Sequence, residues 1–224
     1  MAEIEDITIE EARELVSNQS LWPLVRDFLW NFAPSIHGSW IEDKFGSLEG
    51  KISKPLSLQT SEPIKKFILD SFHVEPCFHR FPKEDGSRLL LLDGTTLESL
   101  AKWLGALACA DALRCVTDGA AVRELKAVLP GIYPEVFGYT MYFGCLEVLK
   151  FGSLDVEKVG HELLVHNFSS LSAPLIQRLH LKLPKRMSDM EPPNFKTSKL
   201  PNLQAATLKL LKLKFPEAYK LCCS

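Results

Sequence analysis

The chain has 224 residues, of which 46% are apolar and 24% are charged. This composition supplies the core of one large domain or two small ones, and it excludes a disordered chain and a small disulfide-stapled protein. The formal net charge of −2 conceals a division, because residues 181–224 hold nine Lys and Arg against three Asp and Glu, whereas residues 1–180 hold 17 against 25. We therefore expect an acidic body with a basic C-terminal segment.

Targeting signals and cysteine spacing bear on the compartment. The acidic N-terminus has neither the basic region nor the apolar run of a secretory signal. The most apolar stretch, Leu97 to Val116, contains four charged residues, so no transmembrane segment is expected. The six cysteines form no CxxC pair or zinc-type spacing. These patterns predict a protein of a reducing cytoplasm, without a cofactor.

Helix-start signals and apolar periodicity predict helices in the first third of the chain. A capping box and further capping residues begin three of them. The predicted ranges are residues 8–16, 21–32 and 61–72, with one helical turn within 40–45. Residues 74–92 remain ambiguous, because the apolar run within them is too short to assign by period, and strand pairing stays open there.

The clearest predicted element begins at a second capping box, Thr95 with Glu98, and extends to Val116. Its large apolar residues occupy one arc of about 180° on a helical wheel. Small residues on the opposite side would allow another backbone to approach closely; they are Gly105, Ala106, Cys109 and Ala110. Asp111 falls within the apolar arc, so we expect it to be paired, with Arg114 the nearest candidate.

The remainder of the chain is predicted to form further helices, with a linker before the last of them. Helices are predicted over residues 118–129, 134–151, 174–181 and 203–215, and another begins at Ser153 or Asp155 and ends at Phe168. Four prolines between 184 and 201 are typical of a linker. The predicted fold is mainly α, a compact multi-helix domain around a buried central helix (about 95–116). The predicted units are a helical domain (1–182), a Pro-rich linker (183–202) and a C-terminal basic amphipathic segment (203–224).

The C-terminal segment places Lys209, Lys212 and Lys214 among leucines, which is typical of a basic amphipathic helix. Such a helix can lie on an anionic membrane surface, bind in a partner's groove or return to its own core. Three lysines without interleaved aromatic residues or Arg do not favour nucleic acid binding.

Catalytic and metal-binding motifs receive little support. The sequence has no GxGxxG, GxxxxGK[ST] or GxSxG pattern. His161 and His166 are five residues apart, about 140° around a helix, so they cannot act as an HExxH pair. His73, Cys77 and His79 could converge on a metal but lack a clear fourth ligand. A small metal-binding protein or enzyme that uses these three residues stays an alternative to a non-enzymatic protein.

The segment 89–137 is similar to the central part of the SctK (YscK) family of type III secretion accessory proteins. The resemblance is one of ordered pattern and covers roughly a fifth of the chain. Its pieces are Leu92-Asp93, Trp103-Leu104-Gly105-Ala106-Leu107, Ala110-Asp111-Ala112-Leu113-Arg114, Asp118-Gly119, Val122-Arg123 and Leu125.

The resemblance implies a helical, non-catalytic adaptor in the bacterial cytoplasm, peripheral to the inner-membrane base of the secretion apparatus. It would link the cytoplasmic domain of the ring protein SctD to the pod protein SctQ, which leads to SctL and SctN. A secretion chaperone, which would form a homodimer and bind an export substrate, stays a second alternative. We expect partner contacts at Arg114, Asp118, Arg123 and Lys126, near the turn between the two best-defined helices, and at Lys209, Lys212 and Lys214.

Overall fold

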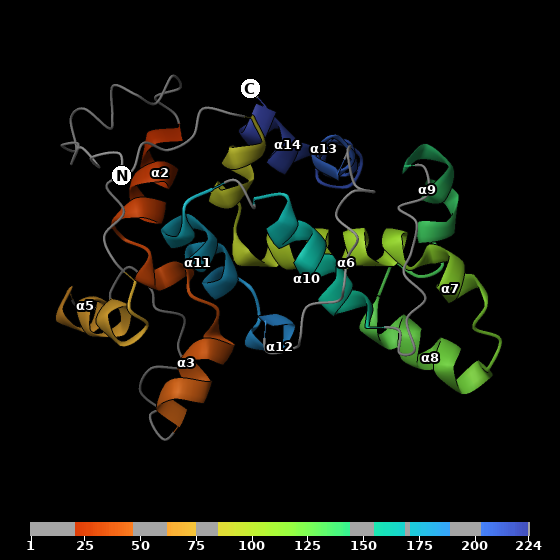
Figure 1. Cartoon of the computed structure of the whole chain (residues 1–224), viewed down its shortest axis with the longest axis horizontal. Coiled ribbons are helices and arrows are strands. Elements are labelled where there is room, and N and C mark those ends of the chain that lie inside the picture. The colour runs from red at the N-terminus through yellow and green to blue at the C-terminus, as the bar shows by residue number, and fades with distance from the viewer. Residues whose placement is uncertain are drawn as a thin grey trace.

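The computed structural model describes residues 21–46, 62–74, 85–143, 155–168, 171–188 and 203–223. Every regular element within these ranges is a helix, which confirms the mainly α fold (Figure 1). The elements in chain order are α2 (Trp22–Leu29), η2 (Ala33–Ser35), α3 (Gly38–Phe45), α5 (Glu62–Ser71), η4 (Asp85–Leu91), α6 (Gly94–Ala108), α7 (Ala110–Arg114), α8 (Gly119–Val128), α9 (Val136–Phe143), α10 (Val156–His166), α11 (Ala173–Lys182), α12 (Lys185–Ser188), α13 (Leu203–Lys214) and α14 (Pro216–Cys223).

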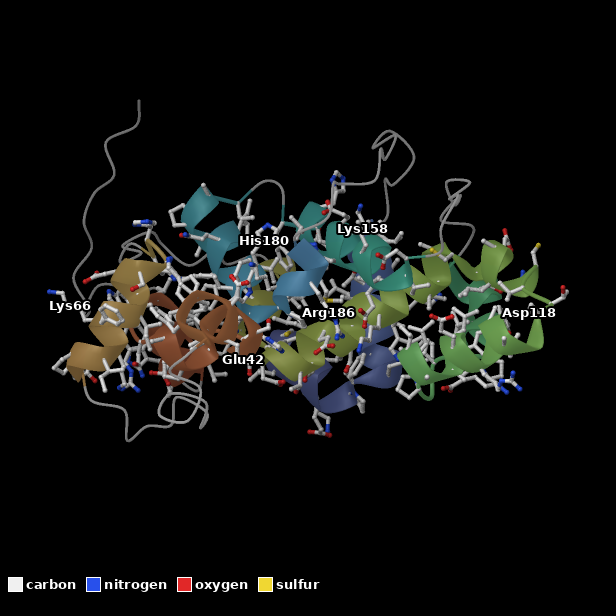
Figure 2. All side chains as sticks on the ribbon, turned by 90° about the horizontal axis from the view of Figure 1, so that it is seen from below. Glu42, Lys66, Asp118, Lys158, His180 and Arg186 are labelled. Carbon is white, nitrogen blue, oxygen red and sulfur yellow. The ribbon has the colours of Figure 1, made fainter. Side chains whose placement is uncertain are left out.

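The molecule is elongated, with α6 near its middle (Figure 1). Helices α3 and α5 lie at one end, and α7, α8 and α9 lie at the other. Figure 2 marks the same two ends by Lys66 on α5 and by Asp118 before α8. The protein therefore presents two surfaces that are far apart.

Several predicted ranges agree with the helices, and others differ. The single turn expected within 40–45 is the eight-residue helix α3, and α14 was not predicted. Residues 85–91 form a 3-10 helix rather than a strand, while 75–84 lie outside the described residues. The predicted helix 8–16 also lies outside them, and of the predicted helix 134–151 the structure describes α9 only.

Helix α6 begins earlier than its predicted capping box. Asp93 is the N-cap residue, and its carboxylate accepts the backbone N–H of Thr96 at 2.9 Å and the Thr96 hydroxyl at 2.7 Å. The Thr95 hydroxyl also donates to Asp93. The prediction of Thr95 as the cap was wrong because the Asp93 carboxylate accepts several donors of the first turn at once, and Glu98 is paired with Lys102 instead.

The predicted helix 95–116 is two helices, because α6 ends at Ala108 and Cys109 leaves the helical conformation. This break rotates α7, so the 100° periodicity of α6 does not continue through it. The Asp111 side chain is consequently 68% exposed, which contradicts its predicted place in the apolar arc. The expected ion pair with Arg114 is confirmed, at 2.9 Å.

The small face of α6 packs against α10, which confirms the expected close approach of another backbone. A Cβ at Gly105 would lie 1.9 Å from the carbonyl oxygen of Val156. A Cβ at Gly160, on α10, would lie 1.9 Å from the carbonyl oxygen of Ala101. The two helices are therefore in backbone contact, and glycine is required on both.

The C-terminal helices pack against the rest of the chain. Leu210 and Leu211 of α13 and Cys222 of α14 are fully buried, and the Arg88 guanidinium donates to the Cys222 carbonyl at 3.3 Å. Residues 183–188, at the start of the predicted linker, also pack, since Leu183 is fully buried and its carbonyl accepts from the Trp40 indole at 2.9 Å. The division into a helical domain (1–182), a linker (183–202) and a C-terminal segment (203–224) stays a prediction.

Candidate partner-binding surface

The seven residues predicted to contact partners lie in two places. Arg114, Asp118, Arg123 and Lys126 belong to the α7–α8 corner at one end of the long axis, where Figure 2 labels Asp118. The three predicted lysines of the C-terminal segment belong to α13. The contacts of each side chain show which of the seven residues stabilise the fold and which are available to a partner.

Arg114 and Asp118 have structural roles in the corner. Arg114 is ion-paired with Asp111, donates to the Thr140 hydroxyl at 2.7 Å and lies 5.5 Å from the centroid of the Phe137 ring. It thereby ties α7 to α9. Asp118 is the N-cap of α8, and its carboxylate accepts the Ala121 N–H at 2.8 Å.

Arg123 and Lys126 are exposed on α8, as is Glu124. None of these three side chains has a hydrogen bond or ion pair with any other described residue. They are consequently the charged groups at this end that a partner can meet without breaking an internal contact.

An open groove of about 490 Å³ lies between α8 and the start of α10. Aliphatic side chains make most of its surface, and three carboxylates complete it. Its lining consists of Val116, Ala121, Glu124, Leu125, Val128, Leu129, Asp155, Val156 and Glu157. Sequence reasoning could not find it, since its two walls are about thirty residues apart and only folding brings them together.

Two of the groove carboxylates are fixed by neighbours. Asp155 caps α10 through the Lys158 N–H at 3.1 Å, and Glu157 lies 3.2 Å from the Lys102 ammonium and 3.0 Å from Arg186. Burial alone would lower the pKa of Lys102, but hydrogen bonds and charge attraction from Glu98 and Glu157 raise it above its usual value. Glu124, the third groove carboxylate, has no hydrogen bond or ion pair with another described residue.

Lys214 is largely covered by neighbouring side chains, and 14% of its own side chain is exposed. Its ammonium lies 4.4 Å from the Trp103 ring and 4.2 Å from the Tyr139 ring, and it forms an ion pair with Glu135. Burial would lower its pKa, but hydrogen bonds and charge attraction with Glu135 and Tyr139 raise it. Lys214 thus anchors α13 to α6 and α9, and its predicted partner contact stays a prediction.

The other two predicted lysines of α13 are more accessible. Lys209 and Lys212 are exposed, and the Lys212 ammonium lies 5.6 Å from the Tyr219 ring. Among the described residues, Lys212 therefore contacts only Tyr219 of the neighbouring helix α14.

The opposite end of the molecule has an apolar surface that sequence reasoning missed. Ile64 is 44% exposed and Phe67 is 56% exposed on α5, whereas Ile68 is buried. The sequence did contain a signal for this surface. Helix α5 carries apolar residues on more than one side, whereas a helix that packs on the core through one face needs them on that face only.

Metal-type residues do not cluster in the part of the chain that the structure describes, where no group of three His, Cys, Asp or Glu could hold a metal ion. His73 is exposed, while Cys77 and His79 lie outside the described residues. His161 and His180 form a pair instead, with 3.2 Å between Nε2 and Nδ1. Burial, then the nearby His161, lower the pKa of His180, which Glu162 partly offsets.

Comparison with protein-family models gives a match. Residues 26–131 match the family described as YOP proteins translocation protein K (YscK), a range that runs from α2 to just beyond α8. No curated protein and no solved structure matches the chain. Within the described residues, no helix is long and apolar enough to cross a bilayer. The match over residues 26–131 supports the assignment of the chain to the YscK family.

Proposed function

We propose that this protein is a non-catalytic cytoplasmic adaptor of a bacterial type III secretion system, linking the ring protein SctD to the pod protein SctQ. The YscK family is a type III secretion family, so the match supports a role in that process. In this proposal the protein lies beside the inner-membrane base and is connected to SctL and SctN indirectly, through SctQ.

The observation that carries the proposal is the presence of two available surfaces at opposite ends of the body. One combines the exposed charges of α8 with the groove beside this helix, and the other presents Ile64 and Phe67 on α5. They differ in chemistry, since the first is charged and the second is apolar. An adaptor needs two such surfaces because it must bind two proteins at once without confusing them.

Two buried groups that could in principle react, the Cys109 thiol and the Arg178 guanidinium, have surroundings that favour a structural role over a catalytic one. Burial, with a smaller effect of Asp155, raises the pKa of the Cys109 thiol to about 12, so this thiol is not a nucleophilic thiolate at neutral pH. Arg178 is 1% exposed and donates to the carbonyls of Phe28 and Leu29 at 3.2 Å each. It completes the C-terminal end of α2, which is a packing role.

Co-purification from the native cell tests the proposal. The full chain is tagged and compared with Val128→Asp in the groove and Phe67→Asp on α5, and captured SctD and SctQ are quantified. We expect the unaltered chain to capture both proteins, and each variant to lose a different one while it keeps the other.

Three results would contradict the proposal. Capture of neither SctD nor SctQ would remove the adaptor assignment. A homodimer that captures an export substrate would favour the chaperone. Stoichiometric, tightly bound metal in the purified chain would favour the metal-binding protein that uses His73, Cys77 and His79.

A further inference from the structure

Two histidines face each other between α10 and α11. His161 lies on α10 and is 1% exposed, and the half-buried His180 lies on α11, where Figure 2 labels it. The distance between His161 Nε2 and His180 Nδ1 is 3.2 Å, and the ring centroids are 5.0 Å apart. A hydrogen bond between two titratable rings therefore joins the two helices.

This contact has room for one bridging proton. A neutral imidazole donates from one ring nitrogen and accepts at the other, whereas a protonated imidazole donates from both. If both rings were protonated, two N–H groups would point at each other across 3.2 Å, and two positive charges would lie side by side. The packed pair consequently keeps at least one neutral imidazole, while an unfolded chain can protonate both.

The charged groups around the pair do not remove this conflict. The Glu162 carboxylate, also on α10, lies 3.7 Å from His161 Nδ1, and one carboxylate can balance one protonated ring but not two. Burial and the nearby His161 lower the pKa of His180, and Glu162 opposes this only in part. Helix α12 also packs against α11 and adds two cations with their ion-pair partners: Lys185 with Asp43, and Arg186 with Glu98 and Glu157.

Helix α11 connects the histidine pair to other parts of the body, because it lies between α2 and α10 (Figure 1). Arg178, two residues before His180, donates to two carbonyls at the end of α2. Lys182, two residues after His180, donates to two carbonyls at the end of η4. Protonation of His180 adds a third positive charge to this short helix. Release of α11 from α10 would therefore also weaken the contacts that hold α2 and η4.

We propose that the contact between His161 and His180 is an acid-sensitive latch, which holds α11 on α10 while one imidazole is neutral and releases α11 when both are protonated. In acid the released state binds one proton more than the latched state, so a falling pH favours release. The latch goes beyond the proposed function, because it lies within the body and uses neither partner-binding surface.

Hydrogen–deuterium exchange of the full chain between pH 7 and 5 reports the release of α11. Amide protection factors, which correct for the pH dependence of intrinsic exchange, are compared between the unaltered chain and His180→Asn. Asn places an amide close to the position of Nδ1 and cannot bind a proton. His161→Gln, whose amide lies close to the position of Nε2, is a second variant. His73→Asn is the matched control, because His73 is exposed and Asn tolerates its φ of 52°.

We expect the protection of α11 and of the end of α2 to fall as the pH decreases. Between pH 6.5 and 5, the fall in the unaltered chain should exceed the fall in His180→Asn and in His161→Gln by about tenfold, because only the unaltered chain excludes a second proton from the pair. His73→Asn should behave like the unaltered chain.

Three results would overturn the inference. Constant protection of α11 in the unaltered chain over this range would do so without any variant. An equal fall in the unaltered chain and in both pair variants would show that other groups carry the pH dependence. An equal loss of protection in α8, at the far end of the molecule, would show that acid unfolds the whole chain rather than releasing α11 (Figure 1).

Discussion

Helix α10 has one sealed side and one open side. Against α6 it is in backbone contact, because Gly105 and Gly160 leave no side chain between the two helices. Toward α8 it leaves a groove of about 490 Å³, with Val156 in its wall. Paired glycines bring two backbones into contact on the first side, whereas Val, Leu and Ala side chains and three carboxylates line the second side. The comparison separates residues that hold the body together from residues available to a partner.

The largest expected effect comes from filling the sealed side. Gly160→Ala places a Cβ 1.9 Å from the Ala101 carbonyl oxygen, so α6 and α10 must separate. We expect a loss of about 3 kcal/mol in the free energy of unfolding, measured by denaturant titration. Gly138→Ala on α9 is the matched control, because its Cβ would meet no atom of the described residues within 4 Å. The control should be neutral or stabilising by up to about 1 kcal/mol; equal losses would refute the backbone contact.

The next effect comes from the buried Arg178. Arg178→Met leaves the Phe28 and Leu29 carbonyls without the donors they have now, and we expect a loss of about 2–3 kcal/mol in unfolding free energy. Arg26→Met is the control, since Arg26 is 54% exposed and pairs only with its neighbour Asp27 among the contacts described here. The control should cost less than about 0.5 kcal/mol. Similar losses would show that Arg178 does not support the end of α2.

Lys182 should make stability depend on pH. Its ammonium donates to the Leu90 and Leu92 carbonyls at 2.7 and 2.6 Å, and burial lowers its pKa to about 7, with Asp93 only partly opposing. Between pH 7 and 9 the unfolded chain keeps this proton while the folded chain loses it. Stability should therefore rise with pH, by at most about 1.4 kcal/mol per pH unit.

The comparison with Lys182→Met isolates this contribution, because the variant lacks the titrating group. Unfolding free energies of both proteins are measured at intervals from pH 7 to 9. Above about pH 9 the Cys109 thiol, whose pKa is raised to about 12, contributes in the opposite direction, since the unfolded chain then releases a proton that the folded chain keeps. Parallel profiles for the two proteins would rule out a neutral Lys182.

Lys214 should have a smaller effect. Lys214→Gln removes the cation between Trp103 and Tyr139 and its ion pair with Glu135, so we expect a loss of about 1 kcal/mol in unfolding free energy. Lys212→Gln, which loses only a 5.6 Å contact with the Tyr219 ring, should cost less than about 0.5 kcal/mol. If both variants behave alike, Lys214 does not anchor α13.

The sequence predicted elements whose signals are local. Asp118 caps α8 as expected, because capping depends on a few neighbouring residues. For α10 the sequence left Ser153 and Asp155 open, and the cap is Asp155. The break at Cys109 was not predictable, since no Gly or Pro marks it and the apolar pattern continues past it. The small face of α6 was recognised, but Gly160 as its counterpart was not, because the pairing of α6 with α10 depends on tertiary packing.

The candidate surface was predicted only in part. Arg123 and Lys126 are exposed on α8, where the sequence placed contacts. The groove beside them needs the start of α10, and the structural roles of Arg114 and Lys214 need Thr140, Phe137, Trp103 and Tyr139, which are remote in the sequence. Residue type and spacing indicate which side chains carry charge, but only the folded chain decides which charges are already paired.

One measurement tests most directly whether the α8 side of α10 is available to a partner. It is the amount of SctD and SctQ captured per molecule of tagged Val128→Asp, relative to the unaltered chain. Val128 is 42% exposed, so the variant should change unfolding free energy by less than about 0.5 kcal/mol. We predict that capture of one of the two proteins falls about tenfold, while the control Leu213→Asp, at an exposed position of α13, captures both normally. Unchanged capture of both by a folded Val128→Asp would contradict it.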